Sequence, residues 1–82
     1  MIPPDALTAL IQTHLSDAQV RITDRTGTMD HYTVMVVSTA FEGKNPLDRR
    51  RLMHQVLQQP MADGRIHALD LKTQTPAEAA GG

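Results

Sequence analysis

The spacing of three β-type segments is the feature that most constrains the fold of this chain. Residues 18–24 alternate apolar with polar side chains, and Tyr32–Ser38 form the strongest β segment of the sequence. A turn-rich connector joins these two segments, which predicts a hairpin. A third segment, Ile66–Leu71, follows after about 27 mostly helical residues, a connection long enough for a right-handed crossover to a parallel neighbour. The sequence therefore predicts a mixed three-stranded sheet.

Two segments carry apolar residues at helical spacing. The first is predicted over residues 3–15, where two prolines occupy the helix start. The second begins with Asn45 as N-cap and runs to about Gln59, where Pro60 disturbs it, so that residues 60–63 form a separate helical turn. The order of elements is then αββααβ, an α+β fold with the helices packed on one face of the sheet.

Composition limits the classes of function. With 82 residues the chain forms one domain with little interior in which to enclose a substrate, which disfavours an enzyme. A net charge of −1 disfavours a globally basic nucleic-acid binder, and the absence of cysteine excludes a thiolate metal site built by this chain alone. The longest apolar run is Val34–Val37 and the N-terminus has no signal core, so we expect no membrane span and a cytoplasmic location.

Four histidines are the main chemical feature of the sequence. His31 stands at the start of the second strand, and His67 stands at the start of the third, on the side that alternation shares with Leu69. Each alone is explained by a structural role. Two histidines are too few for a zinc site, so a metal held by them requires ligands from a partner protein or a small thiol. His14 flanks an apolar stripe, and His54 is predicted to face solvent.

The only run of charge is Arg49-Arg50-Arg51, close to Lys44. Successive helical residues are about 100° apart, so the three arginines fan around the helix instead of forming a stripe. Arg49 shares the sector of Met53 and is predicted to lay its stem against the core. A phosphate-binding patch is the alternative interpretation. The segment around Lys44 has one glycine, and it lacks the two-glycine spacing with which KH domains clamp a nucleic-acid backbone.

Several segments resemble the BolA-like family, in the same order along the chain. They are Phe41-Glu42-Gly43-Lys44, Arg49-Arg50-Arg51-Leu52, Ile66-His67-Ala68-Leu69 and Lys72-Thr73-Gln74-Thr75-Pro76-Ala77-Glu78. The resemblance as a whole covers residues 2–79. Asp30-His31-Tyr32 is similar to a bacterial branch with a histidine just before the second strand. The resemblance implies an αββααβ fold like that of class II KH domains, with a single BolA-like domain over residues 1–76 and a flexible tail over 77–82.

The resemblance also implies a function. BolA-like proteins pair with monothiol glutaredoxins, and each pair holds a [2Fe–2S] cluster to which glutaredoxin and glutathione supply thiolates. In this resemblance the BolA-like protein supplies a histidine ligand, which corresponds to His67 here. The candidate for a second ligand is His31. The implied protein is a non-enzymatic heterodimer partner in iron–sulfur trafficking, iron homeostasis or stress response, with no cofactor when isolated.

An alternative remains open. Some BolA-like proteins are described as DNA-binding transcriptional regulators, for which the contact residues here are Lys44, Arg49, Arg50 and Arg51. A homodimer is the alternative assembly when the chain is alone. The three arginines stand where the family has Arg-His-Arg, and Ala79 stands where it has tryptophan. These departures affect the helix surface and the tail, and they leave His31 and His67 unchanged.

Overall fold

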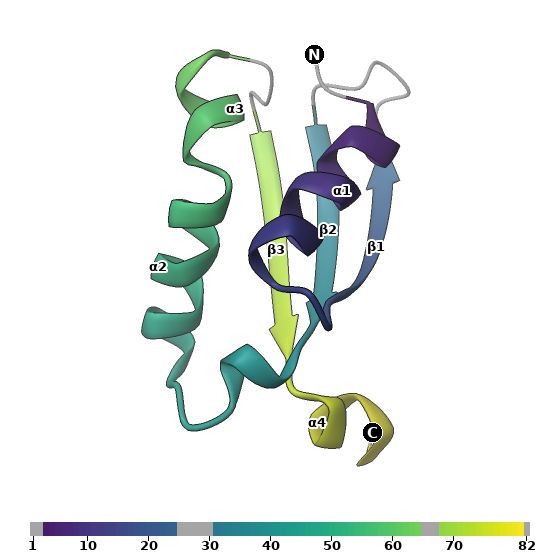
Figure 1. The fold of residues 1–82 in the computed structure, drawn as a ribbon, viewed down its shortest axis with the longest axis vertical. Coiled ribbons are helices and arrows are strands. Elements are labelled where there is room, and N and C mark those ends of the chain that lie inside the picture. The colour runs from purple at the N-terminus through teal and green to yellow at the C-terminus, as the bar shows by residue number, and fades with distance from the viewer. Residues whose placement is uncertain (1–2, 25–30, 65–67, 82) are drawn as a thin grey trace.

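Short elements alternate along the computed structural model of the chain, which describes residues 3–24, 31–64 and 68–81 (Figure 1). They are helix α1 (Pro4–His14), strands β1 (Gln19–Asp24) and β2 (His31–Val37), the 3₁₀ turn η1 (Thr39–Phe41), helices α2 (Pro46–Val56) and α3 (Gln58–Ala62), strand β3 (Ala68–Gln74) and helix α4 (Pro76–Gly81). The predicted αββααβ order is confirmed, and α4 is added to it.

The strands form one sheet with the order β1-β2-β3. Strand β2 lies in the middle, antiparallel to β1 and parallel to β3. Its central residue Val34 is opposite Ile22 on one side and Leu71 on the other. The chain reaches β3 from β2 through η1, α2 and α3, so the helical crossover predicted from the sequence produces the parallel pair.

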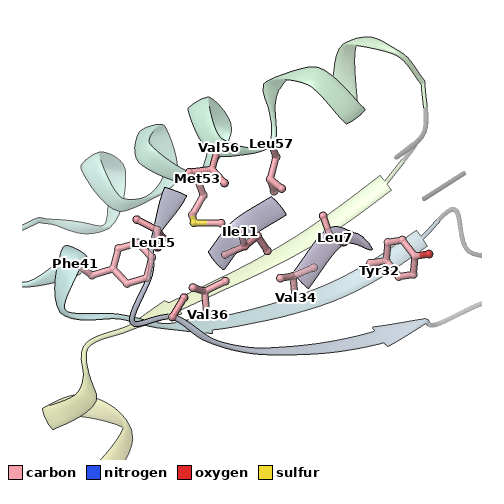
Figure 2. Packing of buried hydrophobic residues seen from close by; sticks show 11 residues of the cluster. Leu7, Ile11, Leu15, Tyr32, Val34, Val36, Phe41, Met53, Val56 and Leu57 are labelled. Atoms are coloured by element: carbon pink, nitrogen blue, oxygen red, sulfur yellow. The ribbon is translucent and has the colours of Figure 1, made fainter. Parts of the chain in front are cut away.

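The core lies between one face of the sheet and the helices. Alternate residues of β2, namely Tyr32, Val34 and Val36, are fully buried, as the two-residue period of a strand requires. Helix α1 packs on them with every fourth residue, and the end of α2 closes the layer (Figure 2). The core side chains from these helices and from the residues that cap them are Leu7, Ile11, Leu15, Met53, Val56 and Leu57. The predicted packing of helices on one face is confirmed.

The loop after β2 is fixed to the core by Phe41. This residue is the last of η1 and has no exposed surface, so its ring holds the loop against the core. A hydrogen bond from the backbone N–H of Ala40 to the Ser38 hydroxyl caps the turn. Because η1 leads directly into the segment before α2, Phe41 sets where the crossover leaves the sheet.

The helical crossover breaks earlier than the sequence predicts. Helix α2 ends at Val56, and Leu57 departs from helical geometry with φ −99° and ψ 10°. Pro60 is buried in the first turn of α3. The N–H groups of a first turn have no acceptor within the helix, so a proline there breaks no helical hydrogen bond. The prediction that Pro60 ends a helix near Gln59 is therefore wrong, because this proline is accommodated at the start of a second helix.

Strand β3 extends further toward the C-terminus than predicted. Its described part runs from Ala68 to Gln74, three residues beyond the predicted end at Leu71. The parallel register explains this extension, because Met35, Val36 and Val37 of β2 each have a partner among these added residues. Ile66 and His67, the predicted beginning of the strand, lie outside the described residues.

The C-terminal segment, predicted as a flexible tail, is helical in the structure, and its flexibility stays a prediction. Pro76–Gly81 form α4, which lies beyond the end of the sheet (Figure 1). The Thr75 hydroxyl accepts a hydrogen bond from the Glu78 backbone N–H, and the Glu78 carboxylate accepts one from the Thr75 N–H. This reciprocal capping box satisfies the backbone N–H groups of Thr75 and Glu78 at the start of the helix. The domain boundary at residue 76 stays a prediction.

None of the described helices is long and apolar enough to cross a membrane.

A cluster of hydrogen bonds around the Asp17 carboxylate connects the turn after α1 to the end of β2. Asp17 accepts hydrogen bonds from the Ser38 hydroxyl at 2.6 Å, from the Thr39 hydroxyl at 2.6 Å and from the Thr39 backbone N–H at 2.8 Å. The hydrogen bond from Ser38, followed by those from Thr39, lowers the pKa of Asp17 from 3.8 to about 2. The ionised carboxylate therefore holds together two segments that are distant in the sequence.

We expect Asp17 to contribute to a loss of stability in acid. The pKa of Asp17 is lower in the folded protein than in the unfolded chain. The stability that this carboxylate contributes is therefore fully present at a pH above the unfolded pKa, and it is lost as the pH falls toward about 2. The thermal midpoint of the wild type should thus fall between about pH 5 and about pH 2, and Asp17→Asn should flatten this slope. Asp5→Asn, at an exposed aspartate outside the cluster, is the matched control and should keep the wild-type slope. Equal slopes for all three proteins would contradict the assignment.

Candidate functional site

His31 and the residue that follows His67 in the sequence lie at one end of the sheet. His31 is the first residue of β2, and the register pairs it with Ala68, the first described residue of β3. Because β2 and β3 are parallel, both strands begin at the same end of the sheet (Figure 1). Ala68 directly follows His67 in the sequence. The fold therefore brings the chain position next to His67 beside that of His31.

The structure describes these two histidines only in part. For His31 it gives the backbone at the strand start, and His67 lies outside the described residues. Leu69 and Leu71, with which alternation groups His67, are half-buried and pack against the core, as predicted. Their partners in the register are the buried Tyr32 and Val34. The core-side assignment is thus confirmed for the described part of β3.

The donor set fits a shared metal centre better than an internal one. Within residues 3–24, 31–64 and 68–81, no three histidine, cysteine or acidic side chains gather closely enough to hold a metal ion. The chain has no cysteine and four histidines. A [2Fe–2S] cluster needs four terminal ligands, so thiolates from another molecule would have to complete a site in which His31 and His67 supply imidazoles.

Arg49, the first of the three arginines, is removed from solvent by an ion pair with α4. Its guanidinium donates to the two Glu78 carboxylate oxygens at 2.7 and 3.2 Å, and its Nε donates to the Lys44 carbonyl at 2.9 Å. The Arg49 side chain is only 13% exposed. The sequence prediction of a half-buried Arg49 is confirmed, and the structure adds its partner.

This ion pair lowers the pKa of Glu78 from 4.5 to about 2, chiefly through the hydrogen bond from Arg49 and then through that from the Thr75 N–H. The same carboxylate thus joins the start of α2, the end of β3 and the start of α4. Arg49 serves this structural link, so it is not available to a phosphate patch.

We expect Glu78→Gln to loosen α4 without unfolding the domain. The amide keeps an acceptor for the Thr75 N–H and loses the charge that attracts Arg49. Exchange of the Ala79 amide, which donates to the Thr75 carbonyl, should accelerate about two- to fivefold, the range expected for one partly exposed ion pair. Glu42→Gln, at an exposed glutamate, is the control and should leave this exchange rate unchanged. Unchanged exchange in Glu78→Gln would refute the proposed link.

The remaining basic residues do not form a single patch. Arg50 and Arg51 are exposed, as the fan of helical positions predicts, and Arg51 lies 3.8 Å from the Asp48 carboxylate. Lys44 is exposed in the loop before α2. With Arg49 paired to Glu78, the four residues predicted as a DNA contact are not presented together as a continuous basic stripe.

The other two histidines are at the surface, as predicted. His14 is exposed at the end of α1 with its Nδ1 3.1 Å from the Leu10 carbonyl oxygen. His54 is exposed on α2, where it borders a hollow beside β3.

Sequence reasoning missed two polar contacts. It gave Asp17 no partner, although this carboxylate receives hydrogen bonds from residues 21 and 22 positions away. It placed Glu78 in a segment that resembles the BolA-like family, but it did not pair Glu78 with Arg49, 29 residues away. A core-facing arginine near a helix start was the available signal, because such a charge requires a partner.

The fold defines a small α+β domain with a mixed three-stranded sheet and helices on one face. The sequence profile described as BolA-like protein matches residues 4–78, so the chain belongs to the BolA-like family. The expectation drawn from the sequence motifs is thereby confirmed.

Known proteins resemble this chain in sequence and in structure. BolA-like protein 1 from Mus musculus is 46% identical over 52 residues, which cover 63% of this chain and 37% of the mouse protein. The chain thus spans less than two fifths of the length of the first vertebrate relatives that it matches. A BolA homologue from Coxiella burnetii has a TM-score of 0.82 and 33% identity, covering 98% of this chain and 99% of that structure.

A similar domain also occurs within a larger protein. The BolA domain of SufE1 from Arabidopsis thaliana matches with a TM-score of 0.80 and 26% identity, covering 95% of this chain and 99% of that domain. The likeness extends over almost the whole chain in both solved structures. The fold described here is therefore shared with these BolA-like domains.

Proposed function

We propose that this chain is a non-enzymatic partner of a monothiol glutaredoxin and that the two proteins share a [2Fe–2S] cluster. The observation that carries the proposal is the parallel register, which pairs His31 with the residue after His67 at one end of the sheet. Membership of the BolA-like family supports the choice of partner. The roles that follow are iron–sulfur trafficking or iron regulation, in the cytoplasm.

The proposed division of ligands follows from the chemistry of this chain. His67 is the primary ligand and His31 is the second, while glutaredoxin and glutathione supply thiolates. Replacing thiolates on one iron by neutral imidazoles reduces the negative charge around the cluster and raises its reduction potential, as in Rieske centres. The isolated chain should bind no cluster, because two imidazoles leave the iron ligands incomplete.

The binding of DNA through the start of α2 is less well supported. Arg49 is paired with Glu78, and the net charge of the chain is −1. The remaining contacts to phosphates would be few, and their contribution would decline with salt.

A reconstitution experiment tests the proposed function. Anaerobic mixing of this protein with a monothiol glutaredoxin, glutathione, iron and sulfide should give a visible absorption and circular dichroism spectrum different from that of the glutaredoxin with glutathione alone. The same mixture should contain a heterodimer by size-exclusion chromatography with light scattering. A spectrum identical to that of the glutaredoxin alone, with no heterodimer, would contradict the proposal.

A further inference from the structure

A hollow of about 490 Å³ borders the outer edge of strand β3. Four consecutive residues of this strand line it, namely Leu69, Asp70, Leu71 and Lys72. Consecutive strand residues point to opposite faces of a sheet, so a hollow that touches all four meets the strand along its edge. The hollow is therefore a groove beside the backbone of β3 that also reaches Thr33 of β2, on the face of the sheet away from the core.

The backbone along this edge has no strand partner within the described chain. Strand β3 pairs with β2 and is the outermost strand of the sheet. The residues of a paired strand direct alternate backbone groups away from the neighbour, and an outer strand leaves these groups available to another chain. An extended segment that enters the groove would add a strand to the sheet.

Helix α2 forms the opposite wall of the groove. Arg50 and His54 are four residues apart, which places them on one face of the helix, and both line the hollow. A second hollow of about 140 Å³ shares Arg50 and Leu71 with the first and reaches Thr73. The groove thus follows β3 from Leu69 to Thr73.

We propose that this groove docks an extended acidic segment of a partner protein, which pairs with the outer edge of β3. Arg50 and Lys72 are exposed and flank the groove, and Asp70 is already engaged in an interaction within the chain. Lys72 alternates with the core-side Leu71, whereas Arg50 lies on α2, which packs on the core side, so acidic side chains on both faces of an added strand would meet these two cations. Apolar side chains on the face toward α2 would meet Leu69 and Leu71. The proposal rests on this edge alone and does not depend on the shared cluster.

The charges favour this occupant over a second copy of the chain. Edge-to-edge pairing of two β3 strands would bring Lys72 and Arg50 near their own copies, and lysine on an exposed edge opposes such pairing. Single-stranded nucleic acid is also disfavoured, because the described residues that line the groove include no phenylalanine, tyrosine or tryptophan on which bases could stack.

A peptide titration followed by NMR tests the proposal. The probe is a blocked seven-residue peptide of glutamate and valine that presents glutamate on both faces of an extended strand, matched to the seven described residues of β3. It should shift the amide resonances of β3 and slow the exchange of its outward-facing amides. The double variant Arg50→Glu, Lys72→Glu should bind this probe about tenfold or more weakly. Arg51→Glu, at an exposed arginine that does not line the groove, should bind it like the wild type.

Three further probes complete the test. Replacing glutamate with lysine in the peptide should abolish binding, and methylation of its backbone nitrogens should do the same because it blocks strand pairing. A single-stranded oligonucleotide of equal charge should not compete. The proposal is overturned if the acidic peptide fails to shift β3, if the lysine peptide binds equally well, if the oligonucleotide binds in its place, or if β3 mediates self-association on concentration.

Discussion

Replacing His67 with alanine is expected to abolish the cluster shared with glutaredoxin and to leave the domain folded. In the proposed complex this imidazole is the primary ligand from the present chain, so its loss leaves one iron short of a ligand. The register supports this location, because the residue after His67 pairs with His31. The visible spectrum of the mixed complex should revert to that of the glutaredoxin alone, and far-ultraviolet circular dichroism should be unchanged.

Two further substitutions control this result. His14→Ala removes an exposed histidine at the far end of α1, and it should retain the mixed spectrum. His31→Ala should give a cluster that forms but is lost faster than in the wild type, because the second ligand is missing. If His67→Ala kept the wild-type spectrum while remaining folded, the assignment of the primary ligand would be wrong.

Replacing Phe41 with alanine is expected to cause the largest loss of stability of any single substitution considered. Phe41 is fully buried at the point where the chain leaves β2, and it packs in the single core between sheet and helices (Figure 2). Removing a buried phenylalanine ring costs about 3–5 kcal/mol, a large part of the roughly 4–12 kcal/mol that stabilises a domain of this length. Urea unfolding followed by circular dichroism measures the loss.

Phe41→Leu is the matched variant for this prediction. It retains most of the buried apolar volume, so its loss of unfolding free energy should be clearly smaller than that of Phe41→Ala. A loss below about 1 kcal/mol for Phe41→Ala would show that the loop does not depend on this anchor.

The sheet topology could be predicted because local patterns decided it. Alternation in the first two strands and the length of the helical crossover were sufficient to predict an antiparallel pair followed by a parallel one. The buried positions of β2 follow the same two-residue period. These features depend on residues that are close in the sequence, so single-sequence patterns capture them.

The boundaries of elements were predicted less well because partners distant in the sequence fix them. Residues 72–74 continue β3 because β2 offers them a parallel partner, although their own side chains are polar. The end of α2 at Val56 allows Pro60 to occupy the first turn of another helix. Neither result follows from local propensity.

The polar contacts of the fold were the hardest to foresee. Glu78 pairs with Arg49 across 29 residues, and that pair links α4 to the start of α2. Sequence patterns identified the two residues separately, Glu78 within a segment of the family resemblance and Arg49 as an arginine with its stem against the core. Only the fold shows that each satisfies the other.

Isotope labelling and pulsed electron paramagnetic resonance test the shared cluster most directly. This chain would be labelled with ¹⁵N-histidine, combined with unlabelled glutaredoxin and glutathione, and the cluster reduced to its paramagnetic state. The account predicts a hyperfine coupling from ¹⁵N that is absent in His67→Ala and present in His14→Ala. A reduced cluster in the verified heterodimer with no ¹⁵N coupling would contradict the claim that this chain supplies a ligand.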